Sequence, residues 1–139
     1  MSANARLFAY GTLMFAPIMR AVCGTAPPSG PAQLADYARY GVIGEIYPAL
    51  VALAGAHVDG IVYDGIAATT WRALDAFEGE LYTRQAVMVT IAANTTVTAW
   101  TYVLAPTRHA LLSDTLWRPA EFASRHLARY LAGLAHSEP

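Results

Sequence analysis

Alternation of apolar and polar positions predicts a β-hairpin in the second half of the chain. Residues 85–91 gather valine and isoleucine on one face, and residues 96–104 alternate in the same way. Asn94 and Thr95 lie between the two runs, where a hairpin needs turn residues. Both faces of the second run carry large side chains, so we expect this strand to be central or to line a pocket.

Shorter apolar runs predict the remaining strands, at residues 7–10, 33–40, 49–54 and 57–63. The last of these runs contains Gly60, and a glycine inside a strand indicates a β-bulge. The segment 26–31 is rich in proline and glycine and is typical of a loop. We interpret residues 41–48 as an irregular turn.

Apolar positions at helical spacing predict three helices, at residues 16–23, 69–78 and 119–134. The first helix has Pro17 in its first turn and Gly24 after its end, which is the usual placement of these two residues. The second helix is followed by Gly79, a residue suited to the left-handed position beyond a helix end. Pro119 begins the third.

The order of these elements predicts an α+β domain with an antiparallel or mixed sheet, because strands and helices do not alternate regularly. The chain has 139 residues, which fits one domain over residues 1–139 with a core at about 6–134. Residues 105–118 form a long connection with some helical content. The sequence leaves open whether this connection is a lid.

Composition excludes several function classes. The net charge is −1 and 14% of residues are charged, so nothing indicates a nucleic acid or an anionic membrane as partner. The low charge leaves an oligomer open. Cys23 is the single cysteine, which indicates a reducing compartment. We see no signal peptide, and the most apolar stretch, residues 46–58, is too short and broken to span a bilayer. We therefore expect a cytoplasmic protein.

The first candidate for chemistry is the loop Tyr10-Gly11-Thr12-Leu13. A glycine at the end of a strand can take a positive φ and lets another atom approach the main chain closely. The adjacent helix start offers free N–H groups, which favour an anion such as a carboxylate. The alternative is a tight turn between two packed elements.

The second candidate is Glu78, which ends the second predicted helix. A helix C-terminus disfavours a carboxylate, and burial beside Phe77 would raise the pKa of Glu78 further. A carboxyl group of that kind suits a general acid or base near neutral pH. Alternatively, Glu78 is solvated or paired with Arg84. We assign Asp75 to structure, as a hydrogen-bond acceptor.

Tyr82 and Tyr102 are candidate pocket residues, because a phenol combines an apolar wall with one polar tip. The alternative for both is an ordinary place in the core or at its rim. The four histidines show no metal-ligand spacing. The chain has no Gly-x-Ser-x-Gly motif and no glycine pattern for phosphate or dinucleotide, so we expect neither a common serine hydrolase nor a nucleotide cofactor.

The motifs Phe8-Ala-Tyr-Gly-Thr-Leu-Met14, Leu74-Asp-Ala-Phe-Glu-Gly79 and Tyr82-Thr-Arg84 occur together here. In this combination the chain resembles the gamma-glutamylcyclotransferase-like proteins, and among them the group named for plant avirulence-induced genes. The similarity extends over roughly residues 6 to 134. It implies a compact α+β domain, built on a small mixed β-barrel with helices packed outside.

The resemblance also implies an activity. In enzymes of this family, the backbone of the loop at Tyr10 to Leu13 holds the α-carboxylate of a gamma-glutamyl group, and the glutamate, here Glu78, is the acid/base. The α-amine attacks the γ-carbonyl, 5-oxoproline closes, and an amine or amino acid leaves. The implied partner is a small gamma-glutamyl substrate, and no metal or organic cofactor is needed. Several such enzymes carry Lys or Arg where this chain has Met14.

Two other hypotheses remain open at this point. The same pocket could capture a small carboxylated metabolite without any chemistry. Alternatively, the domain could be a scaffold with a partner surface near Trp117. The leaving group is also open among gamma-glutamyl amino acids derived from glutathione, gamma-glutamyl amines and a biosynthetic deprotection substrate.

Overall fold

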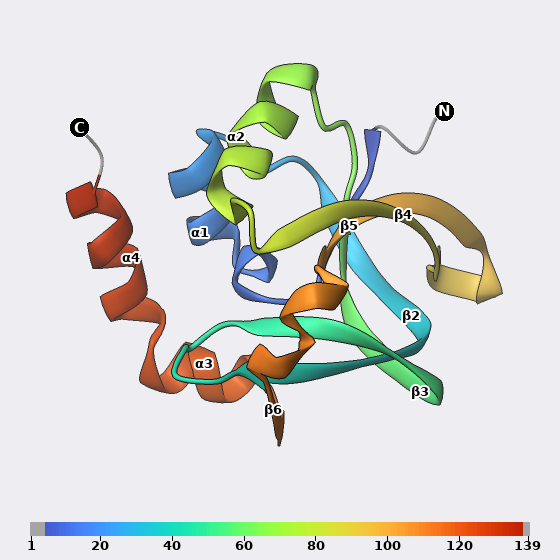
Figure 1. The fold of residues 1–139 in the computed structure, drawn as a ribbon. Helices are drawn as coiled ribbons and strands as arrows, with labels where there is room; N and C mark the ends of the chain where they lie inside the picture. The colour runs from blue at the N-terminus through green and yellow to red at the C-terminus, as the bar shows by residue number, and fades with distance from the viewer. Residues whose placement is uncertain (1–4, 138–139) are drawn as a thin grey trace.

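Within residues 5–137, the part of the chain that the computed structural model describes, strands close into a small barrel with helices outside it (Figure 1). Side chains are described for residues 5–92 and 94–134. The strands are β1 (Leu7–Ala9), β2 (Ser29–Val42), β3 (Pro48–Tyr63), β4 (Tyr82–Thr90), β5 (Thr96–Leu104) and β6 (Leu112–Leu116). The helices are α1 (Ala16–Cys23), α2 (Ala68–Glu78), α3 (Pro119–Arg125) and α4 (Leu127–Ser137).

The barrel runs in the order β3-β1-β5-β4-β2, and β2 closes it by pairing with β3. The β1–β5 pair is parallel, at Leu7 and Trp100, whereas the other pairs are antiparallel. The barrel is therefore mixed, and the expected α+β class with a small mixed barrel is confirmed. The predicted hairpin is β4–β5, which pairs in register from Tyr82 opposite Leu104 to Thr90 opposite Thr96.

The longest strands, β2 and β3, form one bent hairpin. The predicted strands 49–54 and 57–63 are two halves of β3, so their separation in the sequence analysis was wrong. The bend lies where Asp36 and Gly55 take positive φ values of 63° and 85°. The Gly55 N–H donates to the Asp36 carboxylate at 3.0 Å, and the register shifts beside this contact. The irregularity is thus at Asp36, opposite Gly55, and not at Gly60.

The long connection at residues 105–118 contains a 3-10 segment, Pro106–Leu111, followed by strand β6. This strand pairs with β2 at Tyr40 and Val42, outside the closed barrel. The predicted loop at 26–31 is partly wrong, because strand β2 already begins at Ser29. Both segments gain main-chain partners from strands that are distant in sequence.

The final helix was predicted as one element and is two. His126 has φ −129° and ψ −23°, which separates α3 from α4. Phe122 explains the change of direction, because its side chain is buried and its ring contacts Phe15, Trp117 and Tyr130. Beyond this anchor, α4 turns to pack against α1. In Figure 1, α1, α2 and α4 lie together on one side of the barrel.

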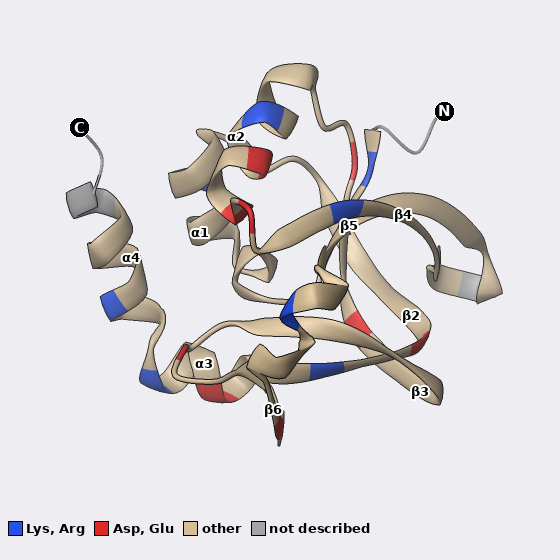
Figure 2. Cartoon of the chain, viewed as in Figure 1, with Lys and Arg blue, Asp and Glu red and all other residues tan. Residues whose placement is uncertain are grey.

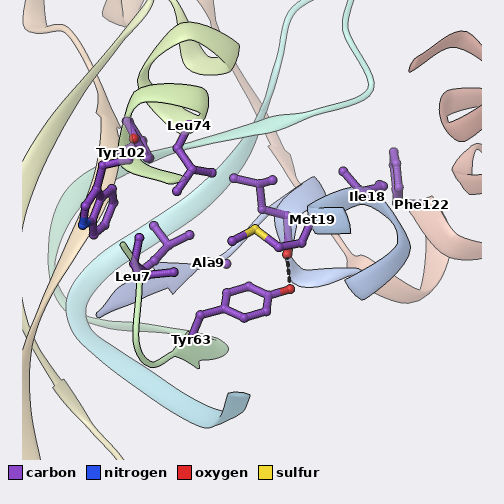
Figure 3. Close-up of a cluster of buried hydrophobic side chains, with 11 residues drawn as sticks. Leu7, Ala9, Ile18, Met19, Tyr63, Leu74, Tyr102 and Phe122 are labelled. Atoms are coloured by element: carbon purple, nitrogen blue, oxygen red, sulfur yellow. Dashed lines mark hydrogen bonds between the residues drawn. The ribbon is translucent and has the colours of Figure 1, made fainter. Parts of the chain in front are cut away.

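A buried cluster joins the barrel to these helices (Figure 3). It includes Leu7 from β1, Met19 from α1 and Leu74 from α2, all nearly free of solvent contact. Tyr63 is a fully buried member of the same cluster and donates its hydroxyl hydrogen to the Leu13 carbonyl at 2.7 Å. The hydrophobic contacts that fix α2 against the barrel therefore also fix the segment that follows β1.

Gly60 has a packing role that yields the first prediction. A Cβ at this position would lie 2.5 Å from the Ala9 carbonyl oxygen and 2.9 Å from the Phe8 ring. We expect Gly60→Ala to lower the free energy of unfolding by about 3 kcal/mol, because β1 must move to relieve the overlap. Urea denaturation measures this loss. The control is Gly30→Ala, where a Cβ meets nothing within 4 Å; equal stability of the two variants would contradict this account.

Candidate active site

A cavity of about 270 Å³ opens between the segment after β1 and the end of α2. All residues that the sequence analysis singled out for binding or catalysis line this cavity: Tyr10, Gly11, Thr12, Leu13, Glu78, Tyr82 and Tyr102. They come from four separate parts of the chain. The fold thus brings the two candidate motifs to one hollow.

The loop after β1 turns into a short 3-10 segment, Thr12–Met14. Its first bond runs from the Met14 N–H to the Gly11 carbonyl, at 3.0 Å. In the described part of the chain, no acceptor is recorded for the N–H groups of Gly11, Thr12 and Leu13, as expected at the start of such a turn. These groups are free to bind a ligand with negative charge.

Gly11 differs from the expectation in one respect. Its φ is −122°, so the predicted positive φ is wrong. The predicted close approach is present, because a Cβ on Gly11 would lie 3.0 Å from Cγ and Cδ of Pro48. Pro48 is buried and forms part of the cavity wall. The reason for a glycine here is therefore contact with β3 and not backbone conformation.

Glu78 is the last residue of α2, and its carboxyl group faces the cavity. Gly79 follows with a φ of 67°, which ends the helix and turns the chain toward β4. Acidic residues colour this end of α2 red in Figure 2. Burial raises the pKa of Glu78 to about 7, because the surrounding protein withdraws the carboxylate from bulk water.

Arg84 forms its ion pair with Asp75 and not with Glu78, so the alternative of a Glu78–Arg84 pair is wrong. The Arg84 Nε lies 3.4 Å from the Asp75 carboxylate. The guanidinium also stacks over Trp71 at 4.6 Å and Trp100 at 5.2 Å. Asp75 further accepts the Tyr102 hydroxyl at 2.6 Å. Asp75 is thus the expected hydrogen-bond acceptor, and it ties the end of α2 to β4 and β5.

Five tyrosines among the described residues surround Glu78 closely enough for its charge to raise the pKa of each phenol: Tyr10, Tyr47, Tyr82, Tyr102 and Tyr130. In every case burial is the larger cause of the raised pKa. The phenols therefore stay neutral at physiological pH. They provide an apolar wall that keeps Glu78 away from water.

Hydrogen bonds hold three of these phenols in place. Tyr10 donates to the Tyr102 carbonyl at 2.6 Å, and Tyr82 donates to the Pro48 carbonyl at 2.7 Å. Tyr102 donates to Asp75, as described above. Because these hydroxyls are engaged, the cavity wall is preorganised and does not need to rearrange around a ligand.

The sequence analysis missed two of the surrounding phenols. Tyr47 lies in the segment 41–48, which the sequence analysis interpreted only as an irregular turn. Tyr130 lies in α4, on the apolar stripe that was interpreted as core packing. Its place beside Thr12 arises only because the chain turns at His126, and no local pattern predicts that turn.

The raised pKa of Glu78 makes stability depend on pH. An ordinary glutamate titrates near 4.5, whereas the pKa of folded Glu78 is about 7, so between these values the folded protein holds more protons than the unfolded chain. The free energy of unfolding therefore falls as pH rises through this window. We expect Glu78→Gln to match the wild type closely at pH 4 and to be more stable at pH 8, by up to about 3 kcal/mol. Urea denaturation at both pH values measures this; an equal difference at both would contradict the assigned pKa.

The described residues include no group of three or more His, Cys, Asp or Glu side chains placed to hold a metal ion. None of the helices within residues 5–137 has the length and apolar character that crossing a bilayer requires. The same cavity is lined by residues 11–13, whose main-chain N–H groups have no recorded acceptor among the described residues, and by Glu78, whose pKa is raised to about 7. The cavity of this barrel protein is therefore lined by a loop of main-chain amides and by one carboxyl group with a raised pKa.

Comparison with known proteins identifies the family. Residues 7–119 match the family described as gamma-glutamyl cyclotransferase, AIG2-like. AIG2-like protein D from Arabidopsis thaliana is 31% identical over 127 residues, which cover 90% of this chain and 83% of that protein. The chain therefore belongs to the gamma-glutamyl cyclotransferase, AIG2-like family.

Solved structures show the same fold. The solution structure of another Arabidopsis thaliana protein superposes with a TM-score of 0.71 at 21% identity, covering 97% of this chain and 94% of that one. A structure of a gamma-glutamyl cyclotransferase gives a TM-score of 0.68 at 18% identity, with 97% and 88% covered. At these identities the similarity establishes the fold, while family membership supports a cyclotransferase type of function.

Proposed function

We propose that this protein is a gamma-glutamyl cyclotransferase that releases 5-oxoproline from a small gamma-glutamyl substrate, with Glu78 as general acid/base. The observation that carries the proposal is the position of Glu78. Its carboxyl group lines the same cavity as the free N–H groups of Gly11, Thr12 and Leu13, and its pKa is raised to about 7. A group with that pKa can both accept and donate a proton at physiological pH.

In the proposed reaction, the N–H groups of residues 11–13 bind the substrate α-carboxylate. The Glu78 carboxylate accepts a proton from the α-ammonium group, and the freed amine attacks the γ-carbonyl carbon. The new C–N bond closes the five-membered lactam, and the bond from the γ-carbon to the leaving nitrogen breaks. The Glu78 carboxyl group then donates its proton to that nitrogen. The carboxylate formed in this step takes the second proton from the attacking nitrogen, which leaves the lactam N–H, and passes it to the released amine. The products are 5-oxoproline and a free amine or amino acid, and no water is consumed.

Much of the rate enhancement would come from confinement of the substrate. A flexible glutamyl chain must curl before its amine reaches the γ-carbon, and a good intramolecular geometry can supply about 7–11 kcal/mol. The cavity volume of about 270 Å³ is at the lower end of ligand pockets, which suits a small substrate. Tyr10, Tyr82 and Tyr102 would form the walls that hold the curled chain and exclude water.

The proposal extends to the chain as a whole. We assign one functional domain to residues 1–139, with its core at about 6–134. The reaction as written uses only main-chain amides and one carboxyl group, so it does not require a metal or an organic cofactor. A single cysteine, Cys23, fits work in a reducing compartment such as the cytoplasm.

The test is release of 5-oxoproline from a panel that contains gamma-glutamyl amino acids, gamma-glutamyl amines and gamma-glutamyl peptides. Turnover of at least one class that depends on Glu78 supports the proposal. Saturable binding of the panel compounds without product, equal in wild type and Glu78→Gln, would replace it with a metabolite-binding protein that performs no chemistry.

A further inference from the structure

A half-buried arginine lies directly behind the loop that follows β1. Arg39 belongs to β2, whose basic segment is blue in Figure 2. Its Nη1 donates to the Tyr10 carbonyl at 2.8 Å and to the Asp59 carbonyl at 3.0 Å. The guanidinium packs over the Trp117 ring at 5.5 Å. Arg39 does not itself line the cavity.

This arrangement is costly for a residue with a packing role only. Burial lowers the pKa of Arg39, which means that its charged form is poorly solvated. Its Nε is buried without a hydrogen-bond partner among the described residues, and neither recorded ion pair involves it. Buried arginines usually face a carboxylate that offsets the loss of water. Here the two short hydrogen bonds go to neutral carbonyl groups, and a third contact, at 3.9 Å, goes to the Met14 sulfur. Burial lowers the pKa of Arg39 by more than the charge of Asp59 raises it.

Peptide geometry links Arg39 to the cavity. The Tyr10 carbonyl and the Gly11 N–H belong to one peptide unit, which is planar and trans, so the two groups point in opposite directions. Because the carbonyl points at Arg39, the Gly11 N–H points away from Arg39, and Gly11 lines the cavity. A cation bonded to the carbonyl also polarises the amide and strengthens its N–H as a donor.

The cavity itself lacks the positive charge that would favour a carboxylate ligand. The described residues that line the cavity include two acids, Glu78 and Glu80, and no lysine or arginine. A ligand carboxylate would therefore meet negative charge with only neutral amides to bind it. The charge of Arg39 reaches the cavity wall, since it lowers the pKa of Tyr10 against the larger effect of burial.

We propose that Arg39 is a positioning residue that makes the loop selective for a carboxylate, by orienting and polarising the peptide between Tyr10 and Gly11. The inference rests on the proposed function, in which that loop binds the substrate α-carboxylate. It adds that the charge required for this recognition comes from β2, one layer behind the loop.

The test compares two probes of nearly the same shape, the charged 5-oxoproline and its neutral carboxamide. Isothermal titration gives the ratio of their dissociation constants for wild type, Arg39→Met and Arg39→Lys. We expect the wild type to prefer the carboxylate and Arg39→Met to lose about tenfold of that preference. Arg39→Lys, which keeps the charge, should recover part of it. In turnover, Arg39→Met should raise KM by a similar factor and leave kcat nearly unchanged.

The matched control is Thr101→Val. The Thr101 hydroxyl donates to the Phe8 carbonyl at 2.8 Å, so this variant also removes a buried hydrogen bond to the segment at β1 but leaves the Tyr10 carbonyl untouched. It should lose stability and keep the wild-type preference for the carboxylate. The control thus separates loss of the Arg39 charge from general weakening of β1.

The outcomes distinguish this inference from the proposed function. An unchanged preference for the carboxylate in Arg39→Met, with turnover intact in the wild type, would overturn the role of Arg39 alone. A wild type that binds both probes equally, or neither, would overturn both. If Arg39→Met does not fold, Arg39→Lys decides: a lower preference for the carboxylate with unchanged kcat supports the role, and an unchanged preference refutes it.

Discussion

Replacement of Glu78 by glutamine is expected to lower kcat/KM for 5-oxoproline release by about 10²- to 10⁴-fold, the range that a general acid/base supplies. Glutamine keeps the shape of the side chain but cannot accept the proton of the α-ammonium group. The wild-type kcat/KM should rise with pH through about 7, where Glu78 becomes a carboxylate. Steady-state kinetics across pH 5–9 measure both the loss of kcat/KM in the variant and the pH at which kcat/KM of the wild type rises.

Glu80 provides a matched control for this experiment. It lines the same cavity two residues further along the chain, but its side chain is exposed. Because the charge of an exposed carboxylate is screened by solvent, Glu80→Gln should keep kcat/KM within about threefold of the wild type. Full activity in Glu78→Gln, or equal losses in the two variants, would remove Glu78 from the proposed mechanism.

Gly11→Val is expected to lower kcat/KM by about 10²-fold while the barrel remains folded. The valine Cβ would lie 3.0 Å from Cγ and Cδ of Pro48, and its two methyl groups add further bulk at this contact. Pro48 cannot yield freely, because it is buried and its carbonyl accepts the Tyr82 hydroxyl. The loop must therefore shift, and a displacement of about 1 Å at a binding site can cost 10²-fold in rate.

Gly30→Val separates this local effect from general loss of stability, because a Cβ at Gly30 would meet nothing within 4 Å. It should keep the wild-type affinity for 5-oxoproline, whereas Gly11→Val should lose most of it, as isothermal titration would show. Affinity of the Gly11 variant equal to that of the wild type would mean that the loop does not bind the ligand.

Elements with local signals could be predicted from the sequence. Pro17 and Gly24 mark the two ends of α1, and the observed helix begins and ends where these residues place it. The β4–β5 hairpin follows from alternation on both sides of a short polar turn. The location of the cavity could also be predicted, because the two motifs that carry the family resemblance both line it.

Elements that depend on distant partners could not be predicted. Gly55 takes a positive φ inside β3 because Asp36 on the neighbouring strand accepts its N–H, a contact that neither sequence window reveals. The break at His126 follows from the burial of Phe122 among three other rings. Arg39 offered no signal for a role at the cavity either, since its bond to the Tyr10 carbonyl joins residues 29 positions apart.

The most direct test of the central claim is a crystal structure of this protein with 5-oxoproline. The account predicts the product carboxylate within about 2.7–3.2 Å of N–H groups in residues 11–13, with the lactam nitrogen facing the Glu78 carboxyl group. Product bound outside the cavity, or bound with its carboxylate away from the loop, would contradict it.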